Sequence, residues 1–195
     1  MSTPQAEFHQ IAAANFARLI EGTTNWDAPS PVPGWQARDV VEHLLTWFPA
    51  MLAEGTSYEI SAGPDPRADL LGAWQHQTAQ VQRLLDDPES ANADFSSDTM
   101  GEQPLSQMIN NFYTGDIFMH SWDLAMATGQ EHGLDQATAA GMLVGMEPMD
   151  QMMRGEHFGP RQPVAEDAPA VEKLMAFIGR DPDWISARGT TPPGV

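Results

Sequence analysis

The stretch Asn111-Phe-Tyr-Thr-Gly-Asp-Ile-Phe-Met-His-Ser-Trp-Asp-Leu-Ala-Met-Ala-Thr-Gly129 predicts the helix around which the fold is organised. We expect this helix to begin near Leu105, directly after Pro104, and to end at Gly129, because Pro favours a first helical turn and Gly commonly follows the last. At about 100° per residue, six apolar side chains and three ionisable ones share one broad face. These are Leu105, Ile109, Phe112, Tyr113, Ile117 and Leu124, together with Asp116, His120 and Asp123.

Asp116 and His120 stand out on this face because they are four residues apart. Side chains at this spacing lie one above the other on a helix and can converge on a single point. An ionised carboxylate within an apolar stripe is costly unless it is paired, hydrogen-bonded or bound to a metal. The spacing therefore fits two ligands of a divalent metal, and it equally fits a buried Asp and His pair without any metal. A third ligand from elsewhere in the chain would favour the metal.

The composition limits what else the chain can use for chemistry. Its 195 residues suit a single domain, residues 1–195, that is large enough to bury a core. The chain has no Cys, which excludes disulfides, thiolate-type zinc sites and a thiol nucleophile of its own. Any metal must therefore be held by His and carboxylate side chains.

The net charge of −18 indicates the kind of partner to expect. Nucleic acids and anionic membranes are polyanions that bind through Lys and Arg, so neither is expected to be a partner. A neutral or cationic small molecule fits better. The sequence has neither a signal-like start nor an apolar run of membrane-spanning length, and we expect a cytoplasmic protein.

Apolar side chains at helical spacing predict further helices over residues 4–21, 37–53, 67–86, 134–153 and 170–178. Pro148 should kink or end the fourth of these early. Residues 87–104 show no lasting period and are expected to form a long crossover loop without strands; whether it covers a site stays open. Residues 179–195 are expected to be a partly ordered tail. The predicted architecture is an all-α bundle, in which sites are built from side chains on facing helices.

Several isolated residues have more than one interpretation. His43 lies at the border of the apolar face of the second helix, where it either looks into a cleft or reaches water. His9 is expected at the surface or at a boundary. His157 is a second-tier metal-ligand candidate in a loop. The Met-rich stretch Met142, Met146, Met149, Met152 and Met153 predicts core packing, with an adaptable surface that forms a homodimer as the alternative.

Three motifs resemble those of a known family. Residues 31–44, Pro-Val-Pro-Gly-Trp-Gln-Ala-Arg-Asp-Val-Val-Glu-His-Leu, resemble the first signature of the mycothiol-dependent maleylpyruvate isomerase N-terminal domain. Residues 116–130, from Asp116 to Gln130, resemble its second. The ending, residues 174–184, is similar to that of short, stand-alone actinobacterial members. This family is a branch of the DinB-like metal-binding four-helix proteins, and the likeness covers nearly the whole chain.

The resemblance implies a DinB-like four-helix bundle with long crossover loops and one or two extra helices. It also implies a metal site in which His43, Asp116 and His120 are the ligands, with Asp116 standing where the isomerase has a Glu. Two His and one carboxylate leave coordination positions open. Zinc is the first choice of metal, and nickel, iron and manganese remain alternatives. Asp123 is expected to orient a ligand His or to tie down a neighbouring helix; direct ligation is the alternative.

The resemblance further implies a thiol transferase or isomerase that uses mycothiol and a small electrophilic substrate. The second domain of the isomerase is missing here, so its own reaction is not expected. One rival is a metal-dependent hydrolase of a small amide or ester, for which Asp123 or Tyr113 would supply the acid or base. The other rival is a non-catalytic metal-binding module with a closed coordination shell.

Overall fold

The computed structural model describes residues 2–98, 100–155 and 158–184. The predicted all-α class is confirmed, with one small sheet added. His157 and residues 185–195 of the predicted tail lie outside the described residues. The elements in chain order are α1 (Pro4–Gly22), α2 (Ala37–Gly55), α3 (Leu70–Asp86), α4 (Pro88–Ala91), β1 (Asp94–Ser97), β2 (Gly101–Pro104), α5 (Leu105–Met108), η1 (Ile109–Thr114), α6 (Gly115–Thr128), α7 (Gln136–Met146), η2 (Glu147–Met149), α8 (Asp150–Met153) and α9 (Ala170–Phe177).

The chain divides into two compact units, and each is described by itself. The first unit combines residues 1–24 with residues 38–121, and the second combines residues 25–37 with residues 122–195. The boundary at residue 121 falls inside α6. The N-terminal half of α6 therefore belongs to the first unit and its C-terminal half to the second.

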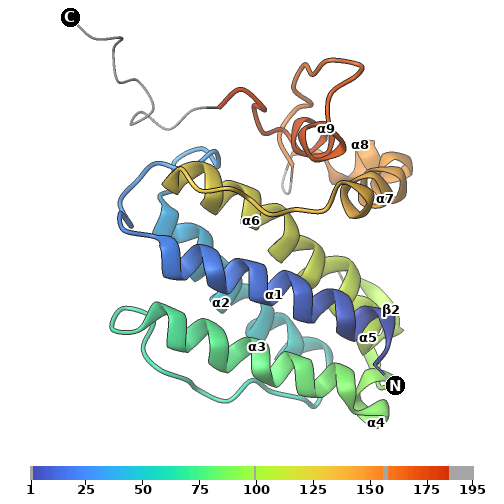
Figure 1. Ribbon diagram of the computed structural model, residues 1–195. Coiled ribbons are helices and arrows are strands. Elements are labelled where there is room, and N and C mark those ends of the chain that lie inside the picture. Colours follow the sequence, from blue (N-terminus) through green and yellow to red (C-terminus); the bar gives the residue numbers. More distant parts are fainter. Residues whose placement is uncertain (1, 99, 156–157, 185–195) are drawn as a thin grey trace, which may run out of the picture. The chain divides into compact units, whose positions relative to one another are not determined.

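The first unit is a helical bundle of α1, α2, α3 and the segment from α5 to the first half of α6 (Figure 1). Side-chain caps start two of its helices: Thr3 accepts a hydrogen bond from the Ala6 amide, and Asp69 accepts one from the Gly72 amide. The ring of Trp74 on α3 lies 4.6 Å from the ring of Phe16 on α1. Such aromatic packing joins α1 to α3.

The predicted helix from Leu105 to Gly129 is present but is not one continuous α-helix. A π-helical segment, η1, separates α5 from α6. The wider turn of a π-helix shifts the faces on its two sides relative to a straight α-helix. This explains why Phe112 is 38% exposed, which corrects its predicted place on the buried face, whereas Ile109 and Tyr113 are fully buried. Gly129, with φ of +70°, ends the helix as predicted.

Residues 87–104 are more regular than predicted. Short helix α4 is followed by the antiparallel pair of β1 and β2, which places Asp94 opposite Pro104. The prediction of a loop without strands is therefore wrong. Phe95 in β1 is fully buried, and a Cβ on Gly55 would come within 2.3 Å of its ring. A single buried Phe in a close contact anchors this hairpin to the bundle.

His9 on α1 is a second correction in the first unit. It is only 1% exposed, although a position at the surface or at a boundary was predicted. The Nδ1 atom pairs with Oε1 of Gln82 at 2.9 Å, while Nε2 is buried without a hydrogen-bond partner. Burial lowers the pKa of His9, although the hydrogen bond to Gln82 and the charge of Asp86 act in the opposite direction.

The second unit contains α7, η2, α8 and α9. Pro148 ends α7 early, as predicted, because it opens the 3₁₀ turn η2. The guanidinium groups of Arg154 and Arg161 lie 4.8 Å and 4.4 Å from the centre of the Phe177 ring. The prediction that the whole Met-rich stretch packs in the core is wrong. Met149 and Met152 are exposed, Met152 at 76%.

Candidate metal centre

Three predicted ligands, His43 on α2 and Asp116 and His120 on α6, come together in the first unit. Each offers one ligand atom, and these three atoms lie within 4.8 Å of one another. The Nε2 atom of His43 is 3.1 Å from Oδ2 of Asp116, and the Nε2 atom of His120 is 3.4 Å from Oδ1. The centroids of the two imidazole rings are 5.0 Å apart. One carboxylate therefore lies between two imidazoles.

The three side chains are unequally accessible. His120 is almost closed off, with 7% of its side chain exposed, while His43 and Asp116 expose 32% and 21% of theirs. His43 thus occupies the border position that the sequence predicts for it. One side of the cluster is within reach of solvent, and a small molecule approaching from there meets His43 and Asp116 first.

Trp47 is a neighbour of the cluster that the sequence analysis did not identify as part of a site. Its indole Nε1 donates a hydrogen bond to Oδ2 of Asp116 at 3.0 Å. Trp47 follows His43 by four residues on α2, so both side chains lie on the same face of that helix. This spacing is the signal that could have revealed it, but apolar Trp residues at helical spacing usually indicate core packing.

The surroundings of Asp116 favour its ionised form. Burial by itself would raise the pKa of the Asp116 carboxyl. The positive charge of His120, the hydrogen bond and charge of His43 and the indole N–H of Trp47 outweigh burial and hold the pKa below its usual value. The carboxylate is consequently negative at neutral pH, as a metal ligand must be.

The donor set fits a divalent cation. Two imidazole nitrogens and one carboxylate oxygen are ligands that zinc, nickel, iron and manganese accept. The distances between the donor atoms are short enough for all three to contact a single ion. Three protein ligands also leave coordination positions for a water or a substrate, as in catalytic rather than structural sites.

Tyr113, the predicted acid or base of a hydrolase, lies in the buried layer behind Trp47. Its hydroxyl accepts a hydrogen bond from the Gln77 amide at 2.8 Å, and the same amide donates to the Leu44 carbonyl at 2.8 Å. The Tyr113 ring stacks on Phe48 with 4.0 Å between centroids. Burial raises the pKa of the Tyr113 phenol, so this group stays protonated at neutral pH.

Asp123 forms a bidentate ion pair with Arg180. Its Oδ1 and Oδ2 atoms accept hydrogen bonds from Nε and Nη2 at 2.9 Å and 3.0 Å. Both residues belong to the second unit, and the Asp123 side chain is completely buried. Asp123 was expected to orient a ligand His or to tie down a neighbouring helix; the pair instead holds the chain that follows α9.

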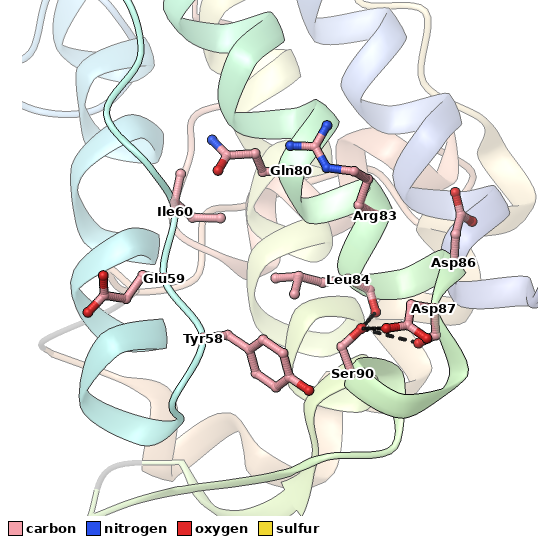
Figure 2. A pocket seen from close by; sticks show the side chains of 9 residues that line it. All are labelled: Tyr58, Glu59, Ile60, Gln80, Arg83, Leu84, Asp86, Asp87 and Ser90. Carbon is pink, nitrogen blue, oxygen red and sulfur yellow. Dashed lines mark hydrogen bonds between the residues drawn. The ribbon is translucent and has the colours of Figure 1, made fainter.

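A recess of about 560 Å³ lies elsewhere on the first unit (Figure 2). Tyr58, Ile60 and Leu84 give it apolar walls, and Arg83 is among its polar side chains. None of its lining residues belongs to the His43, Asp116 and His120 cluster. The recess and the cluster are therefore separate features of the first unit.

Comparison with known proteins identifies the family. The profile of the mycothiol maleylpyruvate isomerase N-terminal domain matches residues 9–125, which include all three clustered residues. The chain belongs to this family. The match confirms the family that the motifs predicted, a mycothiol-related and metal-binding branch of the DinB-like fold.

Two relatives extend the likeness beyond that domain. They are uncharacterized proteins of Mycobacterium tuberculosis, from strain CDC 1551 / Oshkosh and strain ATCC 25618 / H37Rv. Each is 30% identical over 181 residues, which cover 88% of this chain and 95% of the relative. No solved structure matches the chain significantly. Among the described residues, no helix has both the length and the apolar character needed to cross a membrane.

Proposed function

We propose that the protein is a metal-dependent thiol S-transferase or isomerase that uses mycothiol on a small electrophilic molecule. The observation that carries this proposal is the partly exposed cluster of His43, Asp116 and His120 in a chain without Cys. Membership of a mycothiol-related family supports the choice of thiol. Zinc is the first choice of metal, with nickel, iron and manganese as alternatives.

Each residue of the cluster has a defined part in this proposal. His43 and His120 supply neutral nitrogen donors, and Asp116 supplies the negative charge that offsets a divalent cation. A cation held there would favour the thiolate form of a bound thiol, which is the nucleophilic form. The more exposed side chains, His43 and Asp116, border the side from which the thiol enters. The new carbon–sulfur bond uses the sulfur of the small-molecule thiol, because the chain has no cysteine thiol of its own.

The two rival functions have weaker support. A hydrolase needs a free acid or base, but Asp123 is held by Arg180, and the Tyr113 hydroxyl accepts a hydrogen bond from Gln77 while its pKa is raised by burial. A non-catalytic module needs a closed coordination shell, whereas His43 has 32% of its side chain exposed. These features favour a metal site with free coordination positions at which a thiol can bind.

The proposal is tested with protein purified without an affinity tag. Elemental analysis should give about one divalent metal per chain, since the cluster offers one set of ligands. Calorimetric titration should then show mycothiol binding to the metal-loaded protein and no binding after the metal is stripped. S-methylated mycothiol, which cannot form a thiolate, should bind much more weakly. His43→Ala should lose both the metal and the thiol binding.

His76→Ala is the matched control for the His43 variant. His76 also lies in the first unit, on α3, but its Nε2 pairs with the Ser61 carbonyl at 3.0 Å and it is not in the cluster. This variant should keep its metal. Metal without any thiol binding would overturn the transferase proposal in favour of a hydrolase or a binding module. A metal-free wild type would reduce the cluster to a partly exposed carboxylate beside two histidines.

Two expectations accompany the proposed function. We place the reaction in the cytoplasm, where low-molecular-weight thiols are kept reduced. A homodimer stays a prediction, and its test is the mass in solution by light scattering at several protein concentrations. Small-molecule partners rather than nucleic acid or membranes remain the expectation from the charge of −18.

A further inference from the structure

We infer that Trp47 is a positioning residue of the metal site, because its indole N–H holds the Asp116 carboxylate in the orientation that metal binding requires. This inference rests on the proposed function in taking the His43, Asp116 and His120 cluster as a metal site. It concerns a residue outside that ligand set. The inference follows from what happens to each hydrogen bond of Asp116 when the two histidines become ligands.

Three nitrogen atoms face the Asp116 carboxylate: Nε2 of His43 at 3.1 Å, Nε1 of Trp47 at 3.0 Å and Nε2 of His120 at 3.4 Å. An imidazole nitrogen can ligate a metal only after it gives up its proton. When their Nε2 atoms bind a cation, His43 and His120 can no longer donate hydrogen bonds to Asp116. The indole N–H is different, because it is a donor only and does not ionise. Of these three contacts, only the one from Trp47 can remain a hydrogen bond to Asp116 in both the metal-free and the metal-loaded protein.

The contact also distinguishes the two carboxylate oxygens. Trp47 and His43 both approach Oδ2, whereas His120 approaches Oδ1. The indole N–H occupies one lone pair of Oδ2. Rotation of the carboxylate to bind a cation with both oxygens is therefore disfavoured. Trp47 thereby favours coordination through one oxygen. Fixing the carboxylate in advance also removes part of the ordering cost of metal binding.

The indole itself is held in place by packed rings. The Trp47 ring meets Tyr113 edge-on at 5.8 Å and Phe48 edge-on at 6.0 Å. Tyr113 is fixed in turn by the Gln77 amide, which also binds the α2 backbone at Leu44. These contacts leave the indole few alternative orientations. A donor built into such a layer can orient a ligand more reliably than a flexible surface side chain.

The test removes the N–H and keeps an aromatic ring. Trp47→Phe should weaken zinc binding by about tenfold to a hundredfold, the usual effect of losing a hydrogen bond to a metal ligand. Affinity is measured by competition with a chromophoric chelator. The absorption spectrum of the cobalt-loaded protein should also change, because the carboxylate can then rotate. A variant with 3-benzothienylalanine at position 47, which keeps the indole shape without the N–H, should behave in the same way.

Trp74→Phe is the matched control. Trp74 is also in the first unit and also donates an indole hydrogen bond, to the Ala13 carbonyl at 3.1 Å, but it does not contact the cluster. Its loss should lower the melting temperature and leave zinc affinity unchanged. Equal zinc affinity in wild type, Trp47→Phe and the benzothienyl variant would overturn the inference alone. Absence of zinc binding by the wild type would overturn the inference and the proposed function together.

Discussion

Two carboxylates on α6, Asp116 and Asp123, lie seven residues apart and have opposite surroundings. Asp116, in the first unit, faces two imidazoles and an indole and keeps 21% of its side chain exposed. Asp123, in the second unit, is completely buried against the guanidinium of Arg180. An arginine is permanently charged, while an imidazole is largely neutral above pH 7.

If Asp116 is a metal ligand as proposed, this difference separates a carboxylate that binds from one that supports the fold. The charge of Asp123 is compensated by the permanently charged Arg180, so this carboxylate needs no proton or metal ion to balance it. The charge of Asp116 is compensated only when an imidazole takes up a proton or a cation enters the cluster. Two Asp residues on one helix therefore serve different purposes, and isosteric substitutions of both make a direct comparison.

The largest effect is expected for Asp123→Asn. The substitution leaves the Arg180 guanidinium, whose side chain is only 11% exposed, without its counter-charge. Breaking a buried pair in this way costs about 3 to 5 kcal/mol of the free energy of unfolding. Urea denaturation at pH 8 measures the loss.

Asp167→Asn is the control for this substitution, because Asp167 is an exposed Asp in the same unit. It should change the free energy of unfolding by less than about 0.5 kcal/mol. A similar result for Asp123→Asn would mean that the pair with Arg180 is not a structural tie. Loss of metal from the folded Asp123→Asn protein would instead give Asp123 a part in orienting a ligand.

A different pattern is expected for Asp116→Asn. Metal affinity should fall by a factor of about 100 or more, because the neutral amide replaces the charged ligand. The free energy of unfolding of the metal-free protein at pH 8 should change by less than about 1 kcal/mol, since the carboxylate is partly exposed and solvent weakens its ion pairs. The measurements are chelator competition and urea denaturation after metal removal. A large loss of stability with unchanged affinity would reverse the roles assigned to the two carboxylates.

The smallest effect concerns pH and involves His9. Because burial lowers the pKa of His9 in the folded protein, the unfolded chain binds a proton first as the pH falls below about 6.5. Stability contributed by neutral His9 is thus complete above that pH and is lost at lower pH, by at most about 1.4 kcal/mol per pH unit. His9→Leu should remove this component of the pH dependence.

The His9 comparison is best made in a His43→Ala, His120→Ala background. This background removes the two imidazoles of the metal cluster from the comparison. Free energies of unfolding at pH 8 and pH 5.5, with and without His9→Leu, then isolate His9. If the free energy of unfolding changed equally with pH in the proteins with and without His9→Leu, His9 would not be held neutral by the fold.

The clustering of the three candidate ligands could be predicted because it depends on residue type and spacing. Asp116 and His120 are four residues apart on one helix, and His43 stands in a motif that resembles a family signature. The three came together as expected. Trp47 was missed and His9 was misjudged for a common reason: a hydrogen-bonding nitrogen on an aromatic ring leaves no periodic signal, and its partner lies on another helix.

The fold was predictable where apolar side chains repeat over several turns. The helical bounds of residues 4–21 and 170–178 agree with α1 and α9 within one residue. Strands β1 and β2 have four residues each, too few for an alternating pattern to emerge. Only Phe95 marks the buried side of β1. The π-helical segment was missed because its extra residue changes the period within a helix that is otherwise regular.

The π-helical segment η1 also sets how the candidate ligands face their supporting layer. If residues 109–114 formed a regular α-helix at unchanged length, the spacing of Asp116 and His120 would stay the same, but the helix before this segment would rotate by about one residue, or about 100°. Tyr113, which packs against Trp47 behind the carboxylate, lies within this segment. The alignment of the candidate ligands with that layer thus depends on one wide turn. A sequence change that straightened this turn would disturb the site while preserving every candidate ligand.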